Sequence, residues 1–135
     1  LRNRARPYLF SNALTPALLG ATLKTLELVK GGDGLRAQLF RNAKRFREGM
    51  AKAGFTLLPG EHPIIPVMLG DARLAQDLAA AMMDEGVYVT GFSFPVVPKG
   101  QARIRTQMCA GHNDEQVDRA IAAFSRAGRA VGVLR

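Results

Sequence analysis

Two arginines that stand two positions apart are the residues whose spacing first suggests chemistry. The stretch from Ala102 to Met108 reads ARIRTQM, so Arg103 and Arg105 alternate with small or apolar residues. Successive side chains of a β-strand point to opposite faces, and both guanidinium groups would therefore share one face. Such a face is either solvated or binds an anion, because arginine offers paired hydrogen bonds that match a carboxylate or phosphate. The spacing alone leaves both interpretations open.

The other polar residues of interest favour structural roles. His112 and Asp114 could carry out acid–base chemistry, but residues of these types at a helix start more often cap it or fill a turn. Cys109, the single cysteine, is expected to be a buried and unreactive thiol. Ser11 and Asn12 are turn residues that could also hold a phosphate, and the residues alone do not decide between these roles. No catalytic residue is assigned among them.

The composition favours one folded domain that meets anionic partners. The chain has 135 residues, 47% of them hydrophobic, and a formal net charge of +8. Such an excess of positive charge is typical of proteins that bind nucleic acid, phosphates or carboxylates. Sheet-type RNA-binding proteins stack bases on exposed aromatic side chains, whereas the arginine-bearing face holds only Arg103, Arg105 and Gln107. Nucleic acid is therefore not expected as a partner.

The sequence predicts neither a metal site nor a membrane-spanning helix. One cysteine and two histidines, His62 and His112, do not form a ligand set at metal-binding spacing. No apolar run approaches the roughly 18 residues that a membrane helix needs. A single cysteine excludes an internal disulfide and fits a reducing compartment. We therefore expect a cytoplasmic protein without a bound metal.

Hydrophobic periodicity predicts an α+β fold. Helices are expected over residues 16–30, 34–53 and 72–85 and from 113 onward, and strands over 64–69, 87–92 and 103–108. Two helices followed by strand–helix–strand–strand–helix predict a small sheet with helices covering one face. The chain is interpreted as a lead-in segment at 1–15, linking helices at 16–54 and an α+β domain at 55–135.

Local signals place the helix ends and the buried stripes. Thr15 and Pro16 form an N-cap followed by proline at the first helical position, and Asn113 with Gln116 matches a capping box. Pro66 indicates an edge strand or a bulge. The residues expected to face inward are Leu18, Leu19, Leu23, Leu26 and Val29 in the first helix and Leu35, Leu39, Phe40, Phe46 and Met50 in the second.

Longer segments resemble a known enzyme family. The stretches RARPYLFSNAL, HPIIPVMLGDARLA and GVYVTGFSFPVVPKGQARIRTQMCAGH are similar to the C-terminal portion of the α-oxoamine synthases, pyridoxal phosphate enzymes of the aspartate aminotransferase fold type. The resemblance extends over essentially the whole chain and is most specific from Gly91 to His112. There, a VP-x-G loop from Val97 to Gly100 precedes the strand with the two arginines.

The resemblance implies roles for two residues. Arg105, the second arginine of the R-x-R strand, corresponds to the residue that pairs with the carboxylate of the amino-acid substrate. Ser11 corresponds to a Ser or Thr that crosses the dimer interface and binds the cofactor phosphate in the other subunit. For Arg103 the interpretation as a solvated side chain is kept, because this position varies in the family.

The resemblance also implies a reaction, and it indicates that the family's Schiff-base motif is not in this chain. It suggests a homodimeric, pyridoxal phosphate-dependent acyltransferase that condenses glycine with acetyl-CoA to 2-amino-3-oxobutanoate and CoA. None of the five lysines lies in the family's Schiff-base motif, so the chain is interpreted as an inactive C-terminal small domain with its linking helices. The alternatives are a family member that uses another amino acid and acyl-CoA, or a stand-alone basic module that binds RNA or a protein partner.

Overall fold

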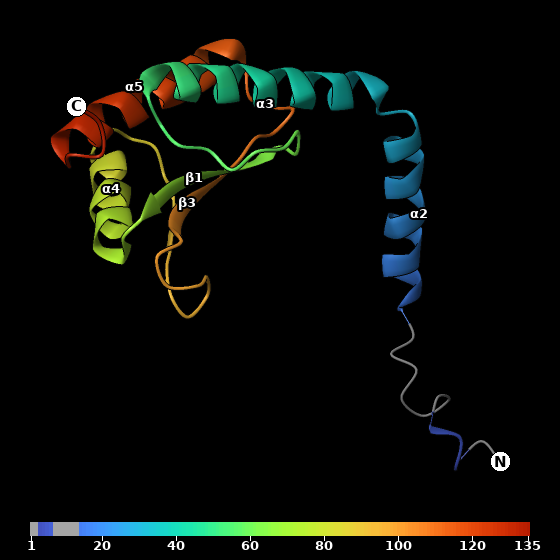
Figure 1. Ribbon diagram of the computed structural model, residues 1–135. Coiled ribbons are helices and arrows are strands. Elements are labelled where there is room, and N and C mark those ends of the chain that lie inside the picture. Colours follow the sequence, from blue (N-terminus) through green and yellow to red (C-terminus); the bar gives the residue numbers. More distant parts are fainter. Residues whose placement is uncertain (1–2, 7–13) are drawn as a thin grey trace. The chain divides into compact units, whose positions relative to one another are not determined.

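The computed structural model describes residues 3–6 and 14–135 (Figure 1). Ser11, the residue predicted to bind the cofactor phosphate, lies outside the described residues. The chain divides into two compact units, Leu1–Asp33 and Gly34–Arg135. No helix in the described ranges is long and apolar enough to cross a membrane.

Helix α2, Pro16–Lys30, is the described helix of the first unit. It begins as predicted: the Thr15 side chain accepts a hydrogen bond from the backbone N–H of Leu18, and Pro16 occupies the first turn. The predicted buried stripe is wrong, because no residue of α2 is buried. Its large apolar side chains are about half exposed, since no other described element of the unit covers them: Leu18, Leu19, Leu23, Leu26, Leu28 and Val29.

A three-stranded antiparallel sheet forms the middle of the second unit. Its strands are β1, Ile64–Gly70, β2, Gly91–Phe92, and β3, Ala102–Gln107, in the order β1–β3–β2. The edge position of β1 agrees with the prediction from Pro66. The predicted strand over 87–92 is shortened to two residues, because only Gly91 and Phe92 pair with β3. Residues 87–90 have no ladder partner in the described part of the chain.

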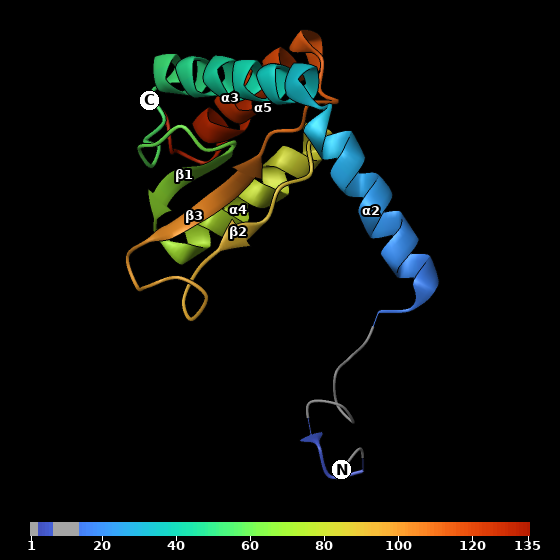
Figure 2. The ribbon, with the colours of Figure 1, turned by 90° about the vertical axis from the view of Figure 1, so that its right-hand side faces the viewer.

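Three helices cover one face of this sheet. They are α3, Asp33–Ala53, α4, Ala72–Asp84, and α5, Asp114–Ala130, and α3 and α5 run side by side in Figures 1 and 2. The Asp71 carboxylate caps α4 by accepting from the Leu74 N–H, and Asn113 and Gln116 form the predicted capping box of α5. The predicted α+β sheet with helices on one face is therefore confirmed.

The core lies between the sheet and these helices. Phe124 of α5 contacts Phe46 of α3 and Phe55 edge-on, with ring centroids 6.0 and 5.8 Å apart, an arrangement that aromatic pairs favour. Phe46 and Met50 are buried as predicted, and Leu39 packs against the core. Leu35 and Phe40 were wrongly placed inside, because they are 67% and 52% exposed on α3.

Two glycines permit close approaches between elements. A Cβ on Gly49 of α3 would lie 2.5 Å from Cδ1 of Ile121 on α5, and a Cβ on Gly91 would lie 2.9 Å from the Ala75 carbonyl oxygen. Side chains at these positions would push α3 from α5 and β2 from α4. The glycines therefore set the distance of both helices from their neighbours.

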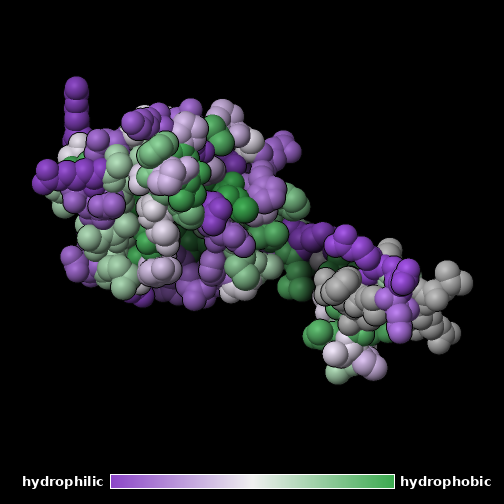
Figure 3. Space-filling view, turned by 90° about the horizontal axis from the view of Figure 1, so that it is seen from below, coloured by the Kyte–Doolittle hydropathy of each residue, from purple (hydrophilic) through white to green (hydrophobic). Residues whose placement is uncertain are grey.

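Apolar side chains remain exposed around the end of the sheet. Tyr88, Phe94 and Val96 are 79%, 61% and 71% exposed. Tyr88 precedes β2, and Phe94 and Val96 belong to the loop between β2 and β3. Figure 3 shows apolar side chains of the larger unit gathered among hydrophilic ones on the face seen from below. Exposed apolar groups of this kind mark surfaces that contact other protein or ligand.

Candidate functional site

One face of β3 is buried in the core, and the other carries polar and charged side chains. Ala102, Ile104 and Thr106 are buried, whereas Arg103 is half-buried and Arg105 and Gln107 are exposed. The alternation predicted from the sequence is therefore present, with both arginines on the face that the helices leave open. Thr106 satisfies its buried hydroxyl by donating to the carbonyl oxygen of Ile65, 2.7 Å away on β1.

Arg105 stacks on an aromatic ring and keeps its hydrogen-bond donors free. Its Cζ lies 4.4 Å from the centroid of the Phe92 ring. Phe92 pairs with Arg103 in the register of β2 and β3, so it reaches Arg105 along the diagonal of the same face. No hydrogen bond or ion pair joins this guanidinium to a residue of the described ranges. A ring beneath its plane leaves the N–H groups directed outward, where they can bind an anion bidentately.

Arg103 has a different local environment. Its Nε donates to the carbonyl oxygen of Gln101 at 3.0 Å, and its Nη2 donates to the side-chain oxygen of the same residue at 3.1 Å. Two of its donors are therefore engaged by the preceding loop. This arrangement favours a structural role for Arg103 and leaves Arg105 as the arginine available to a ligand.

A pocket of about 530 Å³ lies beside Arg105. It is bounded by the unpaired residues 86–90, by the second half of β3 and by the start of α5. His112 and Arg119 line it together with Arg105, and no aspartate or glutamate is among the described residues that do so. Apolar residues, Phe46, Val117 and Phe124 among them, also line this pocket, and its guanidinium and imidazole groups favour an anionic ligand over a cationic one.

The turn after β3 carries His112 to this pocket. The backbone N–H of Cys109 donates to His112 Nδ1 at 3.3 Å, and the imidazole is half-buried. The predicted buried thiol is wrong: Cys109 is exposed, and its Sγ accepts from the Gly111 N–H at 3.3 Å. It lies in an open turn beyond the last buried position of the strand. Asp114 binds Arg45, in keeping with the predicted structural role at the helix start.

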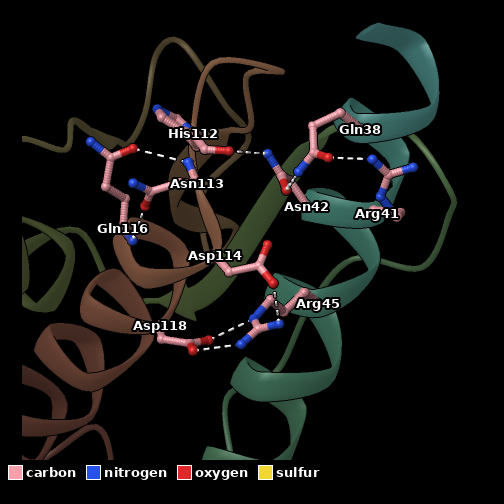
Figure 4. Close-up of polar contacts among 9 residues, drawn as sticks. All are labelled: Gln38, Arg41, Asn42, Arg45, His112, Asn113, Asp114, Gln116 and Asp118. Carbon is pink, nitrogen blue, oxygen red and sulfur yellow. Dashed lines mark hydrogen bonds and ion pairs between the residues drawn. The ribbon is translucent and has the colours of Figure 1, made fainter. Parts of the chain in front are cut away.

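Asn42 of α3 anchors the same turn. Its side chain is 1% exposed. The Nδ2 group donates to the carbonyl oxygens of Cys109 and His112 at 2.9 and 2.8 Å, and Oδ1 accepts from Gln38 at 2.8 Å. Figure 4 shows the His112 carbonyl directed at Asn42 while its ring points away. All hydrogen-bonding positions of this buried amide are thus used, except one lone pair.

An ion-pair cluster fastens α3 to the first turns of α5. Arg45 donates to Asp118 through Nε and Nη2 at 2.7 and 2.6 Å and to Asp114 through Nη1 at 2.9 Å (Figure 4). The hydrogen bonds from Arg45 hold the pKa of Asp118 below its usual range. The fork geometry adds orientation to a contact that is partly exposed to solvent. It helps to fix the start of the helix that follows His112.

Sequence reasoning missed two residues of this site. Phe92 was placed only as a strand residue, and only its pairing with Arg103 of β3 puts it on the arginine-bearing face. Asn42 was overlooked on α3, although it stands four positions before Phe46 and next to Ala43, within the buried stripe. A polar residue inside an apolar stripe is the signal that could have identified it.

A comparison with models of protein families shows which family the chain belongs to. The model named Aminotransferase class I and II matches residues 1–124. The chain belongs to this family. The family assignment agrees with the predicted resemblance to pyridoxal phosphate enzymes of the aspartate aminotransferase fold type.

Curated relatives narrow the similarity within the family. The 2-amino-3-ketobutyrate coenzyme A ligase of Escherichia coli is 59% identical over 134 residues, which are 99% of this chain and 34% of that protein. The human mitochondrial protein of the same name is 52% identical over 99% of this chain and 32% of its own length. A Thermus thermophilus protein named 8-amino-7-oxononanoate synthase/2-amino-3-ketobutyrate coenzyme A ligase is 38% identical. The chain spans about a third of the length of these relatives.

Solved structures of the family share the fold. The serine palmitoyltransferase of Sphingomonas wittichii superposes with a TM-score of 0.88 at 32% identity, over 99% of this chain and 34% of that one. A variant serine palmitoyltransferase from S. paucimobilis with a bound PLP–myriocin aldimine gives a TM-score of 0.87 at 31% identity, over 98% of this chain and 34% of that one. An 8-amino-7-oxononanoate synthase from Francisella tularensis gives 0.78 at 26% identity, over 95% and 37%.

Proposed function

We propose that this chain is the C-terminal part of a pyridoxal phosphate-dependent acyltransferase that condenses glycine with acetyl-CoA. The products are 2-amino-3-oxobutanoate and CoA. The names of the relatives that match almost the whole chain support this activity, and so does membership of the family. The chain alone is proposed to be inactive, because its relatives are about three times as long.

The free guanidinium of Arg105 is the observation that carries the proposal. A glycine carboxylate presents two oxygens in a plane, which match the two N–H groups along one edge of a guanidinium. The Phe92 ring beneath Arg105 restricts rotation of that plane. A carboxylate bound in this way is held in one orientation, so that the bond to its α-proton keeps a fixed direction relative to the reacting groups.

The cofactor is proposed to be held mostly by residues outside this chain. Pyridoxal phosphate, when bound, supplies an electron sink that stabilises negative charge on the α-carbon of an amino acid. The described residues fit the substrate side of such a site, since Arg105, Arg119 and His112 line the pocket among apolar residues and no described aspartate or glutamate does. No lysine lines that pocket within the described residues, so the Schiff-base lysine is assigned to the remainder of the protein.

A homodimer is part of the proposal. Ser11 is proposed to bind the cofactor phosphate of the partner subunit, which would place part of each site on both subunits. The exposed apolar side chains of α2 are suited to an interface in the complete protein. A cytoplasmic location is proposed from the single cysteine of the chain.

A second candidate is 8-amino-7-oxononanoate synthesis. It is favoured by the Thermus thermophilus relative, whose name joins both activities and which is matched over 100% of this chain. Arg105 would bind the carboxylate of alanine in the same manner. The difference would lie in the amino-acid side chain and in the acyl-CoA.

CoA release by the full-length protein tests the two candidates. Glycine with acetyl-CoA is supplied in one reaction, and alanine with a long dicarboxylic acyl-CoA in the other. We expect CoA release only with glycine and acetyl-CoA. Release only with the second pair would assign the protein to the other activity, and release with neither would contradict both.

A further inference from the structure

The turn between β3 and α5 places a second donor group in the pocket that Arg105 lines. His112 uses Nδ1 to accept the Cys109 N–H at 3.3 Å. A neutral imidazole whose Nδ1 accepts carries its proton on Nε2. Nε2 makes no hydrogen bond or ion pair with a described residue, and His112 lines the pocket. His112 therefore offers one N–H donor to a ligand in this space.

The buried side-chain amide of Asn42 holds the backbone of the turn in place. Asn42 donates to the carbonyl oxygens on both sides of the turn, those of Cys109 and His112. These are the residues whose backbone N–H and imidazole form the 3.3 Å hydrogen bond. Gln38 in turn donates to Asn42 Oδ1 at 2.8 Å. Holding both ends of the turn restricts the direction of the ring (Figure 4).

We propose that His112 is a ligand-facing donor that helps Arg105 to bind the carboxylate of the amino-acid substrate, and that Asn42 is the residue that positions it. The proposal rests on the proposed function for the identity of that ligand. Arg105 and His112 line one pocket, and the described residues around it include no carboxylate to compete for their donors. A carboxylate accepts more hydrogen bonds than one guanidinium edge supplies, so an additional N–H donor stabilises the bound carboxylate.

Two substitutions at one position separate binding from turn structure. His112→Asn retains an acceptor near Nδ1 and removes the Nε2 donor, whereas His112→Gln extends an amide donor toward the position of Nε2 and loses the acceptor near Nδ1. Both are compared in the full-length protein with its cofactor bound. The dissociation constant of glycine is measured by calorimetry, and KM for glycine, KM for acetyl-CoA and kcat are measured alongside.

The expected result is a selective loss in His112→Asn. Removing one hydrogen bond to a charged group is expected to raise the dissociation constant and the KM of glycine about 10-fold or more. The KM of acetyl-CoA should stay within about twofold, and His112→Gln should bind glycine more tightly than His112→Asn does. The opposite order, with His112→Gln the weaker binder, would show that His112 only holds the turn and would overturn the proposal.

Asn42→Asp tests the positioning residue with almost no change in shape. The substitution keeps an acceptor for Gln38 and removes both donors to the turn. We expect a higher KM for glycine with the absorbance of the bound cofactor unchanged, and no further loss when His112→Asn is added. Additive losses in the double variant would contradict positioning through His112.

Calorimetry with alanine and serine distinguishes failure of the inference from failure of the proposed function. If alanine or serine binds instead of glycine and the order of the two His112 variants holds, only the proposed substrate is wrong. If glycine and acetyl-CoA react but the order is reversed, only this inference is wrong. If wild-type protein binds none of the three amino acids, both fail.

Discussion

The two faces of β3 have opposite properties although they belong to the same six residues. The inner face is formed by Ala102, Ile104 and Thr106, which are buried against the helices. On the outer face, Arg103 is bound by Gln101, while Arg105 lies over Phe92 and no described residue engages its donors. One strand therefore carries both a packing role and a proposed binding role. The neighbours of each side chain, and not its residue type, distinguish the two arginines.

Because the two faces of β3 differ in this way, substitutions on the strand should change stability and ligand binding separately. Inner-face substitutions remove buried contacts and should act on the free energy of unfolding. Outer-face substitutions leave the core intact and should act on ligand binding. Variants of adjacent residues are therefore the sharpest test of the difference.

Ile104→Ala is expected to have the largest effect on stability. Ile104 is fully buried in the core, and truncation of such a side chain costs about 2–5 kcal/mol through lost burial and the cavity that remains. Urea denaturation of the chain followed by circular dichroism measures this loss. An effect below about 1 kcal/mol would mean that this face of the strand is not packed as described.

Arg105→Ala should give the largest effect on activity with little effect on folding. Losing one partner of a charged hydrogen-bonded pair costs about 3 kcal/mol, which is roughly a 100-fold loss in kcat/KM for glycine. Cofactor affinity, followed by its absorbance in the full-length protein, should change much less. Arg105→Lys is the matched control: it keeps the charge but not the paired donors, so its loss should be intermediate. Equal losses of cofactor and substrate binding would argue against the carboxylate role.

Thr106→Val should weaken stability by about 1 kcal/mol, because it removes the buried hydroxyl that donates to Ile65 while keeping the shape of the side chain. The urea midpoint is compared with that of the wild-type chain at an unchanged slope. Substrate KM in the full-length protein should stay the same. A change in KM without a loss of stability would reverse the assignment of the two faces.

Arg103→Ala is expected to have the smallest effect. Its contacts with Gln101 are exposed, so their removal should change stability by no more than about 0.5 kcal/mol. The KM for glycine should remain within about twofold of the wild-type value. A loss as large as that of Arg105→Ala would show that both arginines bind the substrate and that the contrast on this face is false.

Much of the local structure in both units could be predicted from local patterns. The alternation around Arg105, the caps at Thr15, Asp71 and Asn113 and the order of helices and strands all depend on residues close in the sequence. The apolar stripe of α2 was predicted equally well as a pattern. The burial of this stripe could not be predicted, because a stripe is buried only when another element packs on it. The pattern within a helix does not identify that element.

The sequence by itself determined the α+β order of elements, the face that the two arginines share and the resemblance to the family. Only the tertiary structure decided that Phe92 lies under Arg105, that Cys109 is exposed and that residues 87–90 pair with no described strand. It also brought Asn42 to the turn that ends at His112, 70 positions away along the chain. Periodicity and caps are properties of neighbouring residues, whereas these contacts arise when distant segments pack around one core.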